Sequence, residues 1–303
     1  MPNANKPSQV SPESNVSVSS GERQLKRFER NLKVLEPGSA VDLIAAETGL
    51  SKQKVKDTMQ KGAVWLKRGS KPRKRLRRAK TDLQINDQLD IYYDPHLLAI
   101  SPGKASLVED FGDYSVWYKP PGMLSQGTQW GDHCALLRVV EQAFAGRKVF
   151  LLHRLDKEAC GLIIVGHSPK AAARMGELLQ SRAISKHYRA LLSHAPESAE
   201  GTLTARIDGQ DAETRYRVLG SGAESASVKV DIDLITGRKH QIRRHFSGIG
   251  CALVGDREYG GPSSPDGLCL AAVRLAFQCP LKNRQRDITL PESLMPDWLR
   301  GWK

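Results

Sequence analysis

Five strand-like segments are interspersed with two helix-like segments from Tyr114 to the end of the chain. The strand patterns are SVWYK, GLIIVG, HYRALL, SVKVDIDLI and LCLAAVRLAF, and the helix patterns are DHCALLRVVEQAF and PKAAARMGELLQ. Such elements must bury their apolar faces against one another in layers, and about 190 residues suffice for one domain of this kind. The pattern therefore predicts a mixed α/β domain over residues 113–303, without an internal repeat.

A smaller unit is expected ahead of this domain. Residues 1–22 are rich in Ser, Asn and Pro and predict a disordered tail. Within residues 23–94 we expect a helix around residues 41–45, a second helix capped by Ser51 and ended at Gly62, and strands at 63–66 and 90–94. Residues 95–112 contain two prolines and two glycines and are expected to form a linker.

Positive charge is concentrated in one loop of the smaller unit, residues 67–80. The chain has a net charge of +13, and nine of its basic residues lie in this loop with no acidic residue among them. A run of this kind favours a polyanion, and nucleic acid is favoured over a membrane surface because the loop has no apolar helical face. A solvated loop is the alternative. The expected RNA contacts are Lys71, Arg73, Lys74, Arg75, Arg77 and Arg78.

The cysteines and apolar segments bear on location and cofactors. Five scattered cysteines without a CxxC pair predict neither disulfides nor a zinc site. No apolar run is long enough to span a membrane or placed to act as a signal peptide. We therefore expect a cytoplasmic protein with no membrane partner and no metal.

A polar group precedes the apolar strand that begins at Gly161. It reads His153-Arg154-Leu155-Asp156, and an apolar pair comes directly before it. Strand edges are where scaffolds present functional side chains. Asp156 could be a general base, a nucleophile or only the ion-pair partner of Arg154, and spacing alone favours the last.

The order strand, helix, strand over residues 161–192 predicts a crossover unit. Ser168 and Pro169 suit the N-cap and first position of its helix. If the two strands are parallel, their starts share one edge of the sheet, and Tyr188 lies near Asp156. Otherwise Tyr188 is an ordinary tyrosine of an amphipathic strand.

The segment TGRKHQIRRH at residues 236–245 predicts a turn that leads into a helix. Ile242 and Phe246 should pack inward, while His240 and Arg243 share another face. Cations near a helix N-terminus oppose its dipole, so a phosphate or carboxylate is expected among them. A solvated basic helix is the alternative.

Two further segments are rich in Pro or Gly. KPPGM at residues 119–123 predicts a stiff turn after a strand. VGDREYGG at residues 254–261 lacks the glycine spacing of a nucleotide-binding loop. Neither segment by itself assigns a function.

The order of these motifs resembles the RluA family of RNA pseudouridine synthases. The matching motifs are KPPGM, HRLDKEACGLIIVG, SKHYRALL, IDGQDAETRYRVL, TGRKHQIRRH and ALVGDREYGG, and they lie within residues 117–272. After KPPGM the chain reads SQGT, where many relatives have a short apolar stretch ending in His-Pro. The smaller unit loosely resembles an RNA-binding module first described in a ribosomal small-subunit protein.

The resemblance implies an α+β fold with a mixed, mostly antiparallel sheet, flanking helices and a central RNA-binding cleft, plus a small N-terminal α/β RNA-binding module. It implies isomerisation of uridine to pseudouridine in structured RNA, without a cofactor. Asp156 matches the family's essential aspartate, Tyr188 the tyrosine that packs on the target base, and Arg243 the basic residue that pairs with the aspartate. Substrate contacts are expected from Lys119, His153, Arg154, Lys186, Arg238, His240 and Gln241, in a monomer.

The identity of the RNA and the class of activity stay open at this point. Large-subunit ribosomal RNA is favoured because the N-terminal module is commoner among those relatives. Transfer RNA is the alternative, because Arg243-Arg244-His245 resembles that branch. The basic loop would also suit an RNA-binding or ribosome-assembly protein on a synthase scaffold, and a glycosylase that releases free uracil is a third alternative.

Overall fold

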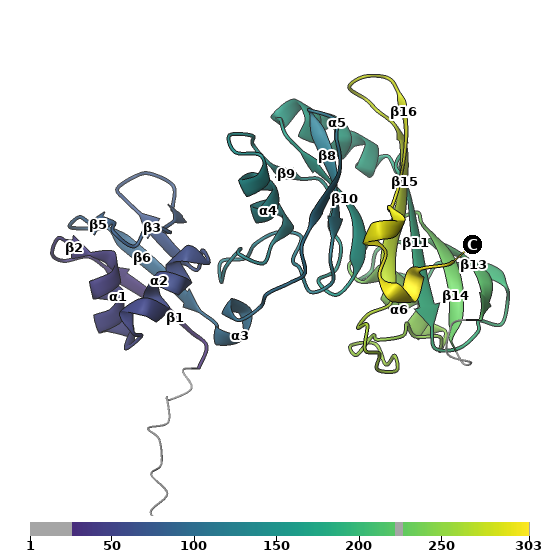
Figure 1. Cartoon of the computed structure of the whole chain (residues 1–303), viewed down its shortest axis with the longest axis horizontal. Helices are drawn as coiled ribbons and strands as arrows, with labels where there is room; N and C mark the ends of the chain where they lie inside the picture. The colour runs from purple at the N-terminus through teal and green to yellow at the C-terminus, as the bar shows by residue number, and fades with distance from the viewer. Residues whose placement is uncertain (1–25, 222–226, 303) are drawn as a thin grey trace, which may run out of the picture.

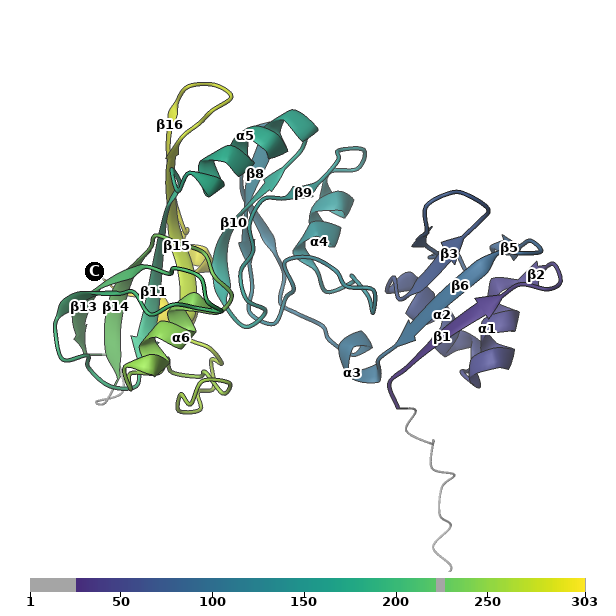
Figure 2. The same cartoon turned by 180° about the vertical axis from the view of Figure 1, so that it is seen from behind.

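The computed structural model describes residues 26–221 and 227–302, and the predicted tail at residues 1–22 lies outside them. The described residues form a small N-terminal domain and a larger domain, which are joined through a short helix (Figures 1 and 2). None of the helices in these ranges has the length and apolar character needed to cross a bilayer.

The small domain packs two helices on a four-stranded sheet. Its helices are α1 (Ala40–Thr48) and α2 (Lys52–Gln60). The sheet order is β1-β6-β3-β4, and β2 pairs with β5 beside it. The strands are β1 (Phe28–Lys33), β2 (Gly38–Ser39), β3 (Val64–Lys67), β4 (Lys74–Arg75), β5 (Asp82–Leu83) and β6 (Gln88–Tyr93).

Local sequence signals place the second helix of this domain. Ser51 caps it, because the Ser51 hydroxyl accepts a hydrogen bond from the Lys54 amide at 3.3 Å. Gly62 follows with φ +79° and donates its N–H to the Met59 carbonyl, so the chain turns away as predicted. Val55 and Met59 then pack into the domain core. Strand β1 has an alternation too weak to be predicted, since four of its six residues are exposed.

The segment predicted as a linker, residues 95–112, is partly regular. It contains α3 (Pro95–Leu98) and β7 (Ser106–Asp110). Strand β7 pairs with β8 (Tyr114–Lys119) at the edge of the large sheet, so the second half of this segment belongs to the larger domain. An edge strand with one solvated face carries little apolar signal, which is why its sequence resembles a loop.

The larger domain is built on a ten-stranded sheet with path β12-β13-β14-β11-β15-β10-β8-β7, to which β16 and β9 are added at β15 and β10. The remaining strands are β9 (Phe150–Leu151), β10 (Cys160–Gly166), β11 (Ser185–Leu192), β12 (Glu200–Leu203), β13 (Thr214–Ser221), β14 (Val228–Leu234), β15 (Leu270–Gln278) and β16 (Gln285–Thr289). Among the described strands, β10 and β15 run parallel and the other pairs in this sheet are antiparallel. The predicted α+β class with a mixed, mostly antiparallel sheet is confirmed.

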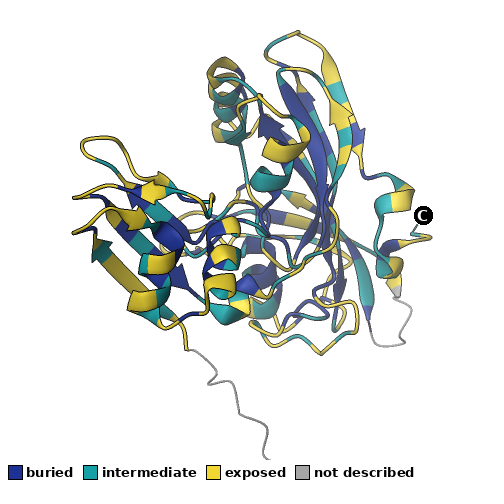
Figure 3. Cartoon of the chain, turned by 60° about the vertical axis from the view of Figure 1, so that its left-hand side comes forward, coloured by how far each residue is buried: buried dark blue, intermediate teal, exposed yellow. Residues whose placement is uncertain are grey.

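Helices cover both faces of the central strands. They are α4 (Leu136–Ala143), α5 (Pro169–Gln180) and α6 (Gln241–Gly248), and short 3-10 turns follow at Glu292–Leu294 and Asp297–Leu299. Leu162 and Ile164 of β10 pack in one cluster with α5, whereas Ile163 and Val165 pack in another with α4. Every residue of β10 is therefore buried, which explains its unbroken apolar sequence (Figure 3).

The strands β10 and β11 are not parallel neighbours, so the condition on which Tyr188 is expected near Asp156 is not met. Strand β15, from much later in the chain, lies between them and runs parallel to β10 and antiparallel to β11. Ala272 faces Gly161 on one side and Tyr188 on the other. Gly161 has φ +116°, and a Cβ there would lie 2.3 Å from the Ala272 oxygen, so only glycine allows this approach. The loop that ends at Asp156 and the middle of β11 are thus brought together by a third strand.

Candidate active site

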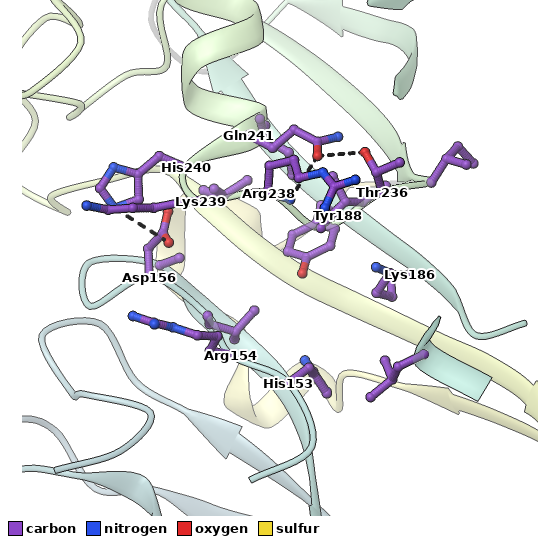
Figure 4. A pocket seen from close by; sticks show the side chains of 18 of the residues that line it. His153, Arg154, Asp156, Lys186, Tyr188, Thr236, Arg238, Lys239, His240 and Gln241 are labelled. Carbon is purple, nitrogen blue, oxygen red and sulfur yellow. Dashed lines mark hydrogen bonds and ion pairs between the residues drawn. The ribbon is translucent and has the colours of Figure 1, made fainter. Parts of the chain in front are cut away.

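A cavity of about 670 Å³ opens on the larger domain where three segments meet. The loop before β10 contributes residues 152–156, the end of α5 and the start of β11 contribute residues 179–188, and the turn before α6 contributes residues 234–242 (Figure 4). The volume falls within the range of cavities that hold small ligands, about 300–1,000 Å³.

Asp156 lies between the side chains of Arg243 and His240 at one side of this cavity. Its Oδ2 atom is 3.6 Å from Arg243 Nη1, and its Oδ1 atom is 3.8 Å from His240 Nε2. The Asp156 side chain is 24% exposed, so it can reach a ligand in the cavity. The structure thus brings Asp156 and Arg243 together, as the family resemblance implies. His240 and Arg243 both approach this carboxylate, but not from a common helical face as predicted, because His240 precedes the helix.

Arg243 is itself held by two carboxylates from the loop that reads VGDREYGG. The Asp256 carboxylate accepts from Arg243 Nε and Nη2, both at 2.8 Å, and Glu258 accepts from Nη2 at 2.9 Å. Burial acts to lower the pKa of Arg243, but the hydrogen bonds and charge of Asp256, with Asp156 and Glu258, outweigh it and raise that pKa above its usual value. The guanidinium therefore stays charged, and its third nitrogen faces Asp156.

Asp256 has no role in our sequence analysis, although it is almost completely buried. It also accepts from the backbone N–H groups of Glu258 and Tyr259, each at 3.2 Å. The flanking glycines are required by close packing: a Cβ on Gly255 would lie 1.7 Å from the Gly267 oxygen, and one on Gly261 1.9 Å from the Leu253 oxygen. The sequence signal that could have identified Asp256 is an aspartate with glycines on both sides of it, Gly255 before and Gly261 after.

The helix that carries Arg243 begins with an unusual backbone conformation. His240 has φ +53°, in the left-handed region that non-glycine residues seldom occupy. Its Nδ1 atom is hydrogen-bonded to the Tyr259 hydroxyl at 3.0 Å. Ile242 and Phe246 pack into the core as predicted. The anion expected among these cations is present as protein carboxylate.

Tyr188 and Lys186 extend from β11 into the same cavity, and the Tyr188 hydroxyl points toward the side formed by His153 and Arg154 (Figure 4). Burial, and then the negative charge of Asp156, raise the pKa of Tyr188 above its usual value, so the hydroxyl remains protonated. Burial, and then the charge of Arg182, lower the pKa of Lys186. The cavity therefore offers an aromatic face and a neutral hydroxyl near a carboxylate.

His153 and Gln241, which are also predicted to contact substrate, line the cavity but form hydrogen bonds with other residues of the chain. His153 Nε2 accepts the Ile164 N–H at 3.0 Å, and burial, followed by the charge of Lys186, lowers the pKa of His153 to about 3. The Gln241 amide donates to the Glu213 carbonyl and the Thr214 hydroxyl, and its oxygen accepts from Thr236 and Arg238. Both side chains hold the walls of the site in place.

The expectation that Lys119 contacts substrate is wrong. Its side chain is fully buried, and its Nζ atom donates to the carbonyls of Pro120, Met123 and Lys157 at 2.8–3.1 Å. Burial lowers the pKa of Lys119 to about 8. Because Lys157 directly follows Asp156, Lys119 joins the KPPGM turn to the loop that carries Asp156. Arg154, in contrast, is exposed at the cavity, and Arg238 is half-buried there, with its Nε atom donating to the Asp211 carbonyl at 3.0 Å.

The predicted RNA-binding loop of the small domain divides into two groups. Arg75 and Arg77 form ion pairs with Asp132 of the larger domain, and Arg73 pairs with Asp90. The other three predicted residues, Lys71, Lys74 and Arg78, have no ion pair among the described residues. The loop also contains the short strand β4, which pairs with β3.

The chemistry available at the cavity is that of a half-buried carboxylate beside a guanidinium, an imidazole and a phenol. Such a carboxylate can attack an electrophile, accept a proton or stabilise a developing positive charge. No cluster of three or more His, Cys, Asp or Glu side chains suited to a metal ion occurs in residues 26–221 and 227–302.

The chain was compared with known proteins. Residues 113–248 match the family described as RNA pseudouridylate synthase. Ribosomal large subunit pseudouridine synthase D of Nitrosomonas europaea is 35% identical over 173 residues, which are 52% of this chain and 49% of that protein. An uncharacterized RNA pseudouridine synthase of Mycoplasma genitalium is 25% identical over 82% of this chain and 87% of its own length.

A solved structure also resembles the fold. Human RNA pseudouridylate synthase domain containing 1 is 24% identical, covers 65% of this chain and 89% of its own, and has a TM-score of 0.54. This likeness concerns the fold alone. The chain spans about half the length of the large-subunit pseudouridine synthase D proteins that it matches.

Proposed function

We propose that this chain, which belongs to the RluA family of RNA pseudouridine synthases, isomerises specific uridines of structured RNA to pseudouridine. The observation that carries the proposal is the position of Asp156, whose Oδ2 atom is 3.6 Å from Arg243 Nη1 at the side of the cavity that Tyr188 enters. These are the three residues that match the family's catalytic positions.

The reaction exchanges one bond of the nucleotide for another. The bond between ribose C1′ and uracil N1 breaks, and a bond between C1′ and C5 forms. C5 loses a proton as N1 gains one, so atoms and charge balance without a second substrate. The carboxylate of Asp156 assists this cleavage, and the neighbouring Arg243 guanidinium pairs with it at 3.6 Å.

Tyr188 acts on the uracil as a neutral phenol. The target base must leave its stack before the enzyme can reach C1′ and C5, and a flipped base is held by stacking and hydrogen bonds. The Tyr188 ring supplies an aromatic surface in the cavity. Because the pKa of Tyr188 is raised, its hydroxyl is protonated and is not a phenolate base. It can accept the C5 proton only if it donates its own hydroxyl proton to another group at the same time.

Large-subunit ribosomal RNA is the proposed substrate, and transfer RNA is the alternative. Similar proteins from three bacteria carry the name ribosomal large subunit pseudouridine synthase D, which supports the first. In the small domain, Lys71, Lys74 and Arg78 supply cations suited to RNA phosphates. We place the protein in the cytoplasm as a monomer, where its five free, buried cysteines would stay reduced.

The test is pseudouridine formation by the purified protein on transcribed large-subunit ribosomal RNA and on transfer RNA. Wild type should convert uridine in the first, and Asp156→Asn should bind the RNA with nearly unchanged affinity but convert none. Conversion of transfer RNA alone would select the alternative substrate. Free uracil as the product would instead indicate a glycosylase, and activity retained by Asp156→Asn would contradict the assignment.

A further inference from the structure

The loop of residues 125–133, which we call the docking loop, leaves the larger domain before α4 and lies against the small domain (Figures 1 and 2). Three hydrogen bonds join its backbone to that domain. The Lys61 carbonyl accepts the Asp132 N–H at 3.0 Å, the Gln129 carbonyl accepts Trp65 Nε1–H at 3.0 Å, and the Thr128 carbonyl accepts from Arg75 Nη2 at 2.9 Å. Backbone bonds of this kind fix a loop in one position.

The carboxylate of Asp132 is the charged centre of this contact. Arg75 Nε lies 3.0 Å from Asp132 Oδ2, and Arg77 Nη2 bonds to the same oxygen. The side chains are only 13% exposed for Asp132, 17% for Arg75 and 24% for Arg77. Removing one member of a pair this well buried leaves the other charge desolvated and unpaired, which is costly.

Aromatic contacts surround the ion pairs. The Arg27 guanidinium lies 3.9 Å from the ring centre of Trp130, and Tyr92 packs edge-on against the same ring at 5.3 Å. Arg75 and Arg73 stack over Trp65, at 4.3 and 4.7 Å. The small domain therefore supplies both apolar surface and charge to this junction.

The junction is too closely packed to accept larger side chains. A Cβ on Gly62 would lie 2.5 Å from Asp132 Oδ1, and one on Gly127 would lie 2.2 Å from Asp132 Cβ. Real Cβ atoms do not approach other atoms so closely. Glycines on both sides of the contact thus let Asp132 reach the two arginines.

We propose that Asp132 is a specificity-determining residue that fixes the small domain on the larger one, so that the protein selects RNAs presenting the target uridine and a second phosphate-rich element at a fixed spacing. The proposal deepens the proposed function and depends on it for the reaction. Arg75 and Arg77 hold the junction, which leaves Lys71, Lys74 and Arg78 of the same loop to meet the second element. Phosphate contacts of this kind position an RNA without reading its sequence.

The first measurement is the distance between spin labels on Glu36→Cys and Lys170→Cys, at exposed positions on the two domains. The five native cysteines are buried, so labelling is selective. Wild type should give one narrow distance distribution, and Asp132→Asn a broad one. Asp297→Asn is the matched control, because this aspartate is 83% exposed and, within the described part of the chain, pairs with Arg300 alone.

The second measurement is kcat and KM on two RNAs, whole large-subunit ribosomal RNA and a stem-loop cut from it around the modified uridine. Asp132→Asn should lower kcat/KM on the whole RNA by about tenfold, mainly through KM, because a loosely tethered domain has a lower effective concentration. It should leave the stem-loop reaction unchanged. Arg77→Gln should give the same pattern, and the double variant should be no worse than either single one.

An unchanged distance distribution in Asp132→Asn, or an equal loss on both RNAs, would overturn the proposal. If wild type formed no pseudouridine at all, the proposed function would fail while the proposal on Asp132 would still be decided. In that case wild type should still show a narrow distance distribution and bind whole RNA more tightly than the stem-loop. The loss of both properties in Asp132→Asn would support the fixed spacing. Their presence in the variant would reject it.

Discussion

Arg243 Nη1 lies 3.6 Å from Asp156 Oδ2 and is a buried nitrogen with no hydrogen-bond partner among the described residues. The other side of the guanidinium is occupied by Asp256 and Glu258. Arg243 is therefore held from behind and directed at the carboxylate of Asp156. The geometry of the cavity depends on residues that do not line it.

Asp256→Asn should lower kcat/KM by about 100-fold, because a small displacement of Arg243 misplaces the charge beside Asp156. It should also cost about 3 kcal/mol of stability, since a buried cation loses its ionised partner. Glu258→Gln is the matched variant: the Glu258 side chain is 55% exposed, and an exposed pair contributes about 0–1 kcal/mol. Kinetics on one RNA and urea unfolding measure both effects. Equal losses in the two variants would contradict the positioning role of Asp256.

His153 makes the stability of the fold depend on pH. Its pKa is lowered to about 3 by burial, and then by the charge of Lys186. The unfolded chain takes up a proton near pH 6.5 and the folded chain does not, so stability is lost as the pH falls from about 6.5 toward 3. The loss is about 1.4 kcal/mol per pH unit.

His153→Gln removes this titration but keeps an acceptor for the Ile164 N–H. The unfolding free energy of each protein is measured at pH 7 and at pH 5. From pH 7 to pH 5 the wild type should lose about 2 kcal/mol more of this free energy than the variant does. Parallel curves would show that His153 does not titrate in this range.

The basic loop should show its two roles in the salt dependence of RNA binding. Replacing Lys71, Lys74 and Arg78 with Gln should reduce the slope of log K against log salt by about 0.7–0.9 for each RNA phosphate that these side chains neutralise. Replacing Arg75 and Arg77 should change the slope less and the domain arrangement more, because both pair with Asp132. The same slope in the wild type and the triple variant would mean that these three residues face solvent.

Much of the site could be predicted because short-range patterns encode it. The helix beginning at Gln241 turns Ile242 and Phe246 into the core by periodicity, and the Ser51 and Ser168 caps have local signatures. The motif order then singled out Asp156 and Tyr188, and both line the cavity. The relation between β10 and β11 could not be predicted, because β15 enters between them from a distant part of the chain, which no local pattern reports.

The residues that sequence reasoning misjudged are those whose role depends on long-range burial. Lys119 looks like a surface cation beside a turn, yet three carbonyls surround its Nζ atom. Asp256 looks like part of a flexible glycine-rich loop, yet it is almost completely buried against Arg243. Arg75 and Arg77 belong to a uniformly basic run, and only the position of Asp132 separates them from their neighbours.

The most direct test of the central claim is a map of pseudouridines in total RNA from cells with and without this gene, by chemical labelling that stops reverse transcription. The account predicts a site in large-subunit ribosomal RNA that disappears on deletion, returns with wild type and does not return with Asp156→Asn. A site restored equally well by Asp156→Asn, or no lost site together with no activity of the purified protein on any transcribed RNA, would contradict it.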